Sequence, residues 1–305
     1  MIDFVGKRHW FFLGSSIAVV VAVFALVVFG LKPGIDFTGG TSMTLNLNPQ
    51  VDQSDLREAV WDAGHEEAMI QGSGEDYLIR LRQLTTDERE ALLTSVGEAT
   101  GSEITVLDYS TVAAAVATET AEKAGIAVLL ASAAMLLYIA WSFRKMPSPF
   151  KWGTCAIVAL LHNIVIVAGL FALLGRFRGV EVDALFITGL LTIVGYTINN
   201  TVVVFDRVRE NRARGVSTDL GIVVNCSLVE TMVRTVNTSL TTLCVILALL
   251  LFGGATIHYF ILVLFVGLLV GTYSSVFIAG PLLVTWEKRE WGQVVENIRS
   301  ARQTA

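Results

Sequence analysis

Hydrophobic and polar positions divide this chain of 305 residues into long apolar runs and one extended polar stretch. A helix needs about 20 mostly apolar residues to cross a bilayer. The runs that reach this length lie near 10–31, 123–143, 153–175, 184–205, 238–257 and 259–286. The pattern therefore predicts a membrane α-helical protein with six transmembrane helices.

The polar stretch between the first two runs has the periodicity of a small folded domain. Residues 41–48 alternate as a strand, and residues 53–64 have helical spacing. The stretch continues with two strands within 67–84, a helix over 85–101 and a strand over 102–112. The order strand-helix-strand-strand-helix-strand is that of a ferredoxin-like α+β domain.

The predicted organisation follows from these elements. Residues 1–31 form an N-terminus and the first transmembrane helix, and 32–122 form the ferredoxin-like domain. Residues 123–286 form helices two to six, and 287–305 form a tail. Within the helical part, residues 206–237 carry charges and an apolar stripe, which predicts an amphipathic connector lying at the cytoplasmic interface.

Composition and charge support the membrane class. Hydrophobic residues make up 53% of the chain and charged residues 16%, whereas soluble domains have about 25% charged residues. Residues 31–121 contain 16 acidic and 5 basic residues, so they carry −11 and the rest of the chain +6, for a total of −5. An acidic lobe argues against nucleic-acid binding, which requires a basic face.

The cysteines give no sign of a disulfide framework or a metal site. Cys155, Cys226 and Cys244 lie outside the polar stretch, and no CxxC pattern is present. We predict no metal and no cofactor.

Lysine and arginine positions predict the orientation. With the N-terminus in the cytoplasm, the segments at the inner side hold fourteen Lys and Arg residues, and the outer flanks of the spans hold four. We therefore expect a multi-pass protein of the cytoplasmic (inner) membrane, with both termini cytoplasmic and the acidic lobe outside.

Polar side chains interrupt three of the apolar runs. Such groups at membrane depth usually face a bundle interior or a partner. They form a candidate intramembrane site made of His162, Asn163, Tyr196, Asn199, Asn200, Thr201, Arg234 and Thr238. The alternative interpretation is structural, because amides and hydroxyls also join helices by hydrogen bonds without any transport role.

Two further groups of residues lie in the fourth and sixth spans. Asp206 and Arg207 mark the predicted cytoplasmic end of the fourth span. In the sixth span, Gly267 and Gly271 form a GxxxG pattern, followed by Ser274 and Ser275. Small residues at this spacing predict close helix packing.

Several motifs together resemble the SecF family, the smaller half of the SecD–SecF protein-export complex within the RND superfamily. They are GIDFTGGT after the first span, VGYTINNTVVVFDRVREN in the fourth, NCSLVETMVRTVNTSLTTL leading into the fifth, LFGG after it, and VGLLVGTYSSVFIAGPLL in the sixth. The resemblance implies SecD and the SecYEG channel as partners, with YajC and YidC as further candidates. It also implies contact with exported unfolded polypeptide and use of the proton gradient.

The chain departs from the family pattern at two positions. The family commonly has His-Asp where this chain has His162-Asn163, and Asn-Asp where it has Asn199-Asn200. An asparagine cannot carry a proton as an aspartate can. Proton coupling then rests on SecD carboxylates, on titration of His162, or is weak in a variant chain. These alternatives stay open.

Two other functions compete with a translocase subunit, which is not an enzyme. The first is half of an RND-type exporter of small molecules or lipids, for which a lobe of about 80 residues is small. The second is an intramembrane enzyme. It would need a nucleophile–base pair or metal ligands, and His162 alone is poor support for one.

Overall fold

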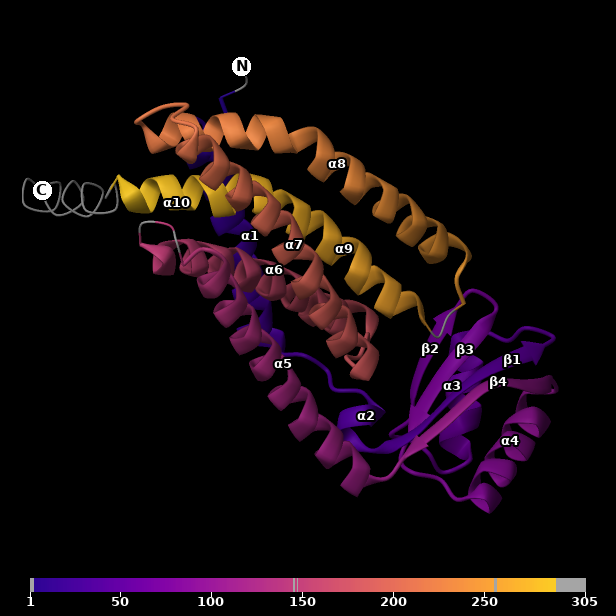
Figure 1. Cartoon of the computed structure of the whole chain (residues 1–305). Coiled ribbons are helices and arrows are strands. Elements are labelled where there is room, and N and C mark those ends of the chain that lie inside the picture. The colour runs from indigo at the N-terminus through magenta and orange to yellow at the C-terminus, as the bar shows by residue number, and fades with distance from the viewer. Residues whose placement is uncertain (1–2, 145, 147, 255–256, 289–305) are drawn as a thin grey trace, which may run out of the picture.

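A computed structural model describes residues 3–144, 146, 148–254 and 257–288, so the predicted tail lies outside the described residues from 289 onward. Within these ranges, six helical stretches are long and apolar enough to cross a membrane, as predicted. They are α1 (Arg8–Phe29), α5 (Ala114–Ser142), α6 (Pro149–Arg178), α7 (Ala184–Ala213), α8 (Leu220–Phe252) and the continuous run of α9 (His258–Ser274), η2 (Ser275–Ala279) and α10 (Gly280–Glu287). Figure 1 shows that α1 begins and α10 ends at the end of the bundle far from the lobe.

The lobe has the predicted ferredoxin-like fold, with β1 (Gly40–Asn48), α3 (Gln53–Asp62), β2 (Met69–Ser73), β3 (Asp76–Leu81), α4 (Thr86–Thr100) and β4 (Glu103–Val112). Between residues 40 and 112, its strands form one antiparallel sheet in the order β2-β3-β1-β4. Its core contains Met43, Leu45 and Ile79 of the sheet and Leu56 and Val60 of α3.

The helix ends of the lobe are fixed by local chemistry. Thr85 and Glu88 form a reciprocal capping box at the start of α4, and Gly101 ends that helix in a left-handed conformation. Both devices satisfy backbone groups that have no partner within the helix. The same logic starts α7, where Asp183 Oδ1 accepts from the backbone N–H of Phe186 at 2.8 Å.

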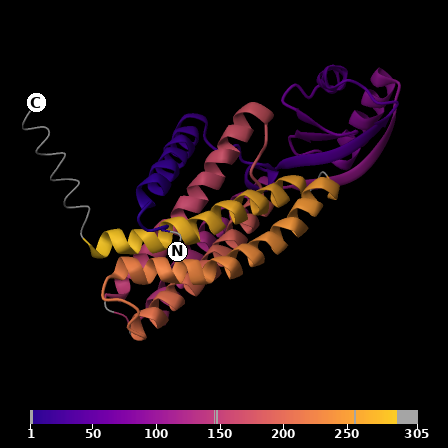
Figure 2. The same cartoon turned by 90° about the horizontal axis from the view of Figure 1, so that it is seen from above.

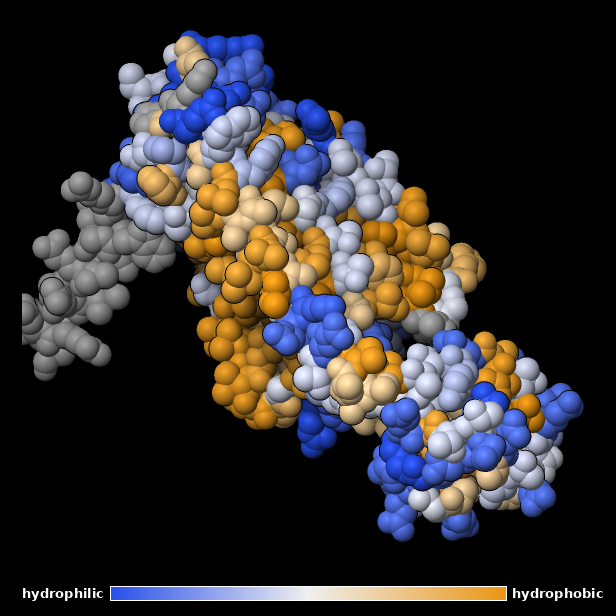
Figure 3. Space-filling view, turned by 60° about the horizontal axis from the view of Figure 1, so that its bottom comes forward, coloured by the Kyte–Doolittle hydropathy of each residue, from blue (hydrophilic) through white to orange (hydrophobic). Residues whose placement is uncertain are grey.

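The transmembrane helices divide into central and peripheral members. Half of the most apolar stretch of α7 is buried inside the chain (50%), against 6% for α5. The helices α6, α7 and α9 therefore form the centre, and α1, α5 and α8 are peripheral. In Figure 2, α1 (indigo) and α8 (orange) lie on opposite sides of the bundle. In Figure 3 the apolar surface covers the helical part, and hydrophilic surface gathers over the lobe and the opposite end.

Residues 206–237 do not form the separate connector that the sequence predicted. All of them are described, and they belong to the ends of α7 and α8, which are joined by residues 214–219. The charges pair across these two helices. Arg207 lies 2.5 Å from Glu210 and 2.6 Å from Glu230. The pair with Glu230 joins the ends of α7 and α8.

The segment that enters the lobe makes close backbone contacts. Helix α2 (Ile35–Thr38) is followed by Gly39 at φ +78° and Gly40 at φ +131°. A Cβ at Gly40 would lie 2.6 Å from the carbonyl oxygen of Leu81, and one at Gly39 would lie 3.1 Å from Cα of Ala114. The two glycines therefore let the start of the lobe press against β3 and the start of α5.

Candidate intramembrane polar site

A buried row of polar side chains runs between the central helices, and we call it the polar seam. It consists of Asn163 on α6, Thr197, Asn200 and Thr201 on α7, and Ser275 on η2. The Nδ2 of Asn163 donates to Thr197 Oγ1 at 3.3 Å, and the hydroxyl of Thr201 donates to Ser275 Oγ at 3.2 Å. Asn163, Thr201 and Ser275 were predicted from sequence to belong to polar or packing groups, and the fold places them together.

His162 extends the seam toward α1. Its Nδ1 lies 3.0 Å from Oδ1 of Asn163, and its Nε2 is hydrogen-bonded to the hydroxyl of Ser15. One imidazole therefore joins α1 to the amide of the seam, with a different partner on each ring nitrogen. This arrangement holds the ring in a fixed orientation.

Asn200 is the unsatisfied member of the seam. Its side chain is only 4% exposed, and among the described residues its Nδ2 has no hydrogen-bond partner. A buried donor without a partner costs about 1–3 kcal/mol. Such a group marks a place where a water, an ion or a group from another chain would be stabilised.

The other predicted site residues lie away from this row. Asn199, Arg234 and Thr238 are exposed on the surface of the chain. Tyr196 is half-buried, and its hydroxyl donates to the carbonyl oxygen of Thr238 at 3.0 Å, which joins α7 to α8. The adjacent asparagines are thus divided by helix geometry, with Asn200 inside the chain and Asn199 outside it.

Asp206 and Arg207 are distant from the seam along α7. They lie about two turns before the helix ends at Ala213. Asp206 pairs with Arg209 on the same helix. Arg207 holds Glu230 of α8, as described above, so this pair serves the contact between the two helices.

The small residues of the last span lie close to α7. A Cβ at Gly267 would overlap the side chain of Ile193, and one at Gly271 would lie 2.5 Å from Thr197 Oγ1. Ser275 donates to the carbonyl oxygen of Gly271 at 2.8 Å. The residues Ser275–Ala279 form a π-helical segment, a feature often found at functional sites.

Two hydrogen bonds between helices involve serines that the sequence did not single out. Ser15 of α1 bonds His162, and Ser239 of α8 accepts from the hydroxyl of Thr272 at 2.8 Å. Both serines stand next to other hydroxyls, Ser15 beside Ser16 and Ser239 beside Thr238. Whether such a serine faces another helix or the lipid depends on how the helices pack, which the sequence does not show.

The comparisons with known proteins identify the family. The model of the C-terminal part of the SecD/SecF protein export membrane protein matches residues 92–289, and the SecD/SecF GG motif matches residues 24–51. The protein translocase subunit SecF of Thermobaculum terrenum is 41% identical over 95% of this chain and 96% of that protein. The chain belongs to the SecD/SecF family.

Two comparisons with SecDF of Thermus thermophilus show that this chain corresponds to part of a longer protein. The translocase subunit SecDF of that organism is 37% identical over 95% of this chain, which covers 39% of the longer protein. The crystal structure of Thermus SecDF, a translocon-associated membrane protein, aligns with a TM-score of 0.85 and 37% identity over 94% of this chain and 39% of that one. Family membership and the six apolar helices make the chain a multi-pass membrane protein. The GG motif covers Gly39 and Gly40, whose close backbone contacts are described above.

Proposed function

We propose that the chain is an accessory subunit of the Sec protein translocase that pairs with SecD and promotes export of polypeptides through SecYEG with help from the proton gradient. The observation that carries this proposal is the match to SecF over nearly the whole length of both chains. SecDF of Thermus supports the pairing, because one chain there contains the counterpart of this one within a protein more than twice as long.

The surface of α7 and α8 supports a partner within the membrane. Asn199 and Arg234 are exposed there, on helices long and apolar enough to cross a membrane. A charged or amide side chain facing lipid is costly, and such residues usually face protein. SecD covering this surface would remove them from lipid and would bring its own groups close to Asn200.

The orientation in this proposal has both termini in the cytoplasm and the lobe outside the inner membrane. It can be tested with single cysteines in a chain lacking its own three. Glu98 lies exposed on α4 and Thr218 lies exposed between α7 and α8. An impermeant maleimide on intact cells should label Glu98→Cys and spare Thr218→Cys. The opposite labelling would overturn the orientation.

Co-purification tests the pairing most directly. The full chain, expressed with SecD and the channel, should retain both in mild detergent. Deleting residues 41–110 should leave that association intact and slow the release of exported protein, because we propose that the lobe contacts the emerging polypeptide. Transport of a small molecule or lipid without any SecD association would favour the exporter alternative.

The polar seam is proposed as the part of this subunit that responds to protonation. An amide has donors and an acceptor but no charge to give up, so it resembles a carboxylic acid held in its neutral form. The chain with Asn163 and Asn200 should therefore stay near a protonated-like state, and coupling should follow SecD carboxylates or His162. Asn163→Asp and Asn200→Asp, singly and together, should add a new titration or raise gradient-dependent export.

The measurement is export rate against an imposed proton gradient, for the unchanged chain and each variant. His162→Gln separates the remaining alternatives, because it keeps polarity without a titrating ring. The seam is purely structural if export by the unchanged chain depends fully on the gradient, and if neither His162→Gln nor the Asn163→Asp and Asn200→Asp variants alter that dependence.

A further inference from the structure

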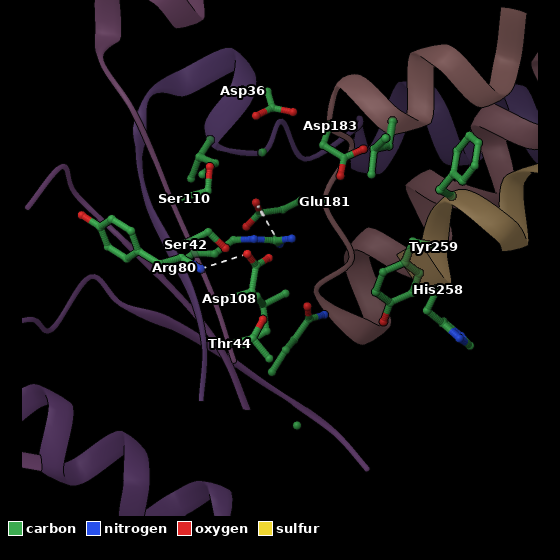
Figure 4. A pocket seen from close by; sticks show the side chains of 18 residues that line it. Asp36, Ser42, Thr44, Arg80, Asp108, Ser110, Glu181, Asp183, His258 and Tyr259 are labelled. Atoms are coloured by element: carbon green, nitrogen blue, oxygen red, sulfur yellow. Dashed lines mark hydrogen bonds and ion pairs between the residues drawn. The ribbon is translucent and has the colours of Figure 1, made fainter. Parts of the chain in front are cut away.

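The lobe touches the membrane part at a polar cavity of about 480 Å³, lined on one side by the sheet and on the other by the loop before α7 and the start of α9. Figure 4 shows Arg80 of β3 and Glu181 of that loop pointing toward each other across it. Their charged atoms lie 3.0 Å apart, and the side chains are 16% and 8% exposed. An ion pair this well buried is costly to break on one side only.

Further contacts join the lobe and its entry segment to the same loop. The Nε2 of Gln71 on β2 donates to the carbonyl oxygen of Arg178 at 2.6 Å. The backbone N–H of Gly34 donates to the carbonyl oxygen of Val182 at 2.7 Å. Asp36 of α2 accepts from the N–H of Ala184, the first residue of α7, at 2.8 Å. The lobe is therefore attached to the outer end of the helix that carries the seam.

We propose that Arg80 is a positioning residue. Its cation compensates the buried carboxylate of Glu181, which keeps the lobe docked on the loop before α7 and so transmits the position of the lobe to that helix. The inference rests on the proposed export function for its purpose, but the docking contact itself is independent of that function. Arg80 is the cation on the lobe side, and Glu181 is the carboxylate on the helix side.

The charges around Glu181 decide how docking responds to acid. Six ionisable side chains line the cavity or act on Glu181. They are Lys32 between α1 and α2, Asp36 of α2, Arg80 of β3, Asp108 of β4, Asp183 just before α7, and His258 of α9. Burial raises the pKa of Glu181 above its usual 4.5, although Arg80 and Lys32 oppose the shift. Burial also raises the pKa of Asp183, with Asp36 adding to the effect.

A raised pKa in the docked form means that docking takes up protons. The ionised carboxylate weakens docking above the raised pKa, and this penalty disappears as the pH falls through that pKa toward 4.5. Acidification of the side that bears the lobe should therefore favour the docked position. Removing Arg80 should make docking depend more strongly on pH, because the buried carboxylate of Glu181 then lacks its nearest cation.

Spin labels can report docking in the full chain with SecD in lipid nanodiscs. With the native cysteines replaced, labels at Glu98 of α4 and Leu251 of α8 lie on the two sides of the joint, both at exposed positions. The unchanged pair should give one distance at pH 8 and pH 5. Arg80→Gln should add a second, longer distance at pH 8 in half or more of the molecules, and this component should shrink at pH 5.

Matched variants distinguish docking from folding. Arg80→Lys keeps the cation and should retain the single distance. The double variant Arg80→Gln with Glu181→Gln removes the unpaired carboxylate and should restore docking at pH 8. Arg82→Gln is the control, because Arg82 lies two residues along the chain and pairs with exposed Glu88 at 2.9 Å. It should behave as the unchanged chain.

The proposal is overturned if Arg80→Gln keeps the unchanged distance at pH 8, or if the double variant is no closer to the unchanged chain than the single one. Export is measured separately on the same proteins. Arg80→Gln should lower gradient-dependent export, and the double variant should recover it. If the unchanged chain itself shows no gradient-dependent export, the proposed function fails, while the label distances still decide whether Arg80 keeps the lobe docked by compensating Glu181.

Discussion

The lobe and the membrane part both bury apolar side chains, but they differ in the polar groups that they bury and in what they expose. The lobe buries large aliphatic side chains such as Leu45, Leu56 and Ile79, and carries its charge outside. The membrane part buries hydroxyls and amides along the polar seam and exposes valines and leucines on α1, α5 and α8. Water drives apolar groups together in the lobe. In a bilayer that force is missing between helices, so small residues and hydrogen bonds hold them.

The difference predicts which substitutions matter in each region. In the lobe, loss of buried volume should dominate. In the membrane part, added volume and lost hydrogen bonds should dominate, and exposed apolar residues should matter little to the fold of the isolated chain.

The first prediction concerns a cavity in the lobe. Leu56 on α3 is fully buried, so Leu56→Ala should lower the free energy of unfolding of the lobe by about 2–5 kcal/mol. Pulse proteolysis of the full chain across a urea series would measure it. Trp61→Ala on the same helix is the control, because Trp61 is 46% exposed. Equal effects at the two positions would contradict a core built on aliphatic burial.

The second prediction adds volume to the membrane part. A side chain at Gly271 meets Thr197, so Gly271→Leu should cost about 1–3 kcal/mol of folding free energy through overpacking. Unfolding in mixed micelles with increasing SDS would report it, together with the fraction that retains SecD. Gly195→Leu on α7 is the matched control, because nothing lies within 4 Å of a Cβ there. A harmless Gly271→Leu would show that the helices can separate at this point.

The third prediction removes one hydrogen bond from the seam. Thr197→Val keeps the shape and deletes the acceptor of Asn163, which should cost about 0.6–2 kcal/mol. The same SDS titration measures it. Thr192→Val is the control, since the Thr192 hydroxyl is exposed and bonds the Thr188 carbonyl of its own helix at 2.8 Å. No difference between the two variants would mean that the buried hydroxyl adds nothing to packing.

The same contrast explains how far the sequence could be interpreted. The lobe was predictable element by element, because alternation and helical spacing are local signals. The number of spans was predictable from apolar length. The path from α7 to α8 was not, because the pairing of Arg207 with Glu230 joins residues 23 positions apart.

The candidate site was predictable in its residue types and only partly in its arrangement. Asn163, Thr201 and Ser275 meet in the seam, but Asn199 and Arg234 face outward. Helical spacing alone leaves open which face of a six-helix bundle is the inside, since every face of α7 is largely apolar. The partner of His162 on α1 depends on how two distant helices cross, which no local pattern encodes.

The last prediction concerns charge at the surface of the lobe, where water should weaken every effect. Hydrogen bonds from the backbone N–H of Thr85 and from Arg82 and Thr85 side chains lower the pKa of Glu88 from 4.5 to about 2. A carboxyl with a depressed pKa in the folded state stabilises that state above its unfolded pKa, and the contribution is lost as the pH falls through 4.5 toward about 2. The start of α4 should therefore exchange its amide hydrogens faster, relative to a neutral cap, below about pH 4.5.

Glu88→Gln is the sharp comparison, because glutamine also fits a capping box but does not titrate. Hydrogen exchange of the full chain at pH 3 and pH 6 should show a loss of protection at the first turn of α4, after correction for the intrinsic pH dependence. This loss should be larger for the unchanged chain than for the Glu88→Gln variant. If both forms lose protection equally, the capping box is not the group that senses acid in the lobe, and the surface charges are only a solvated exterior.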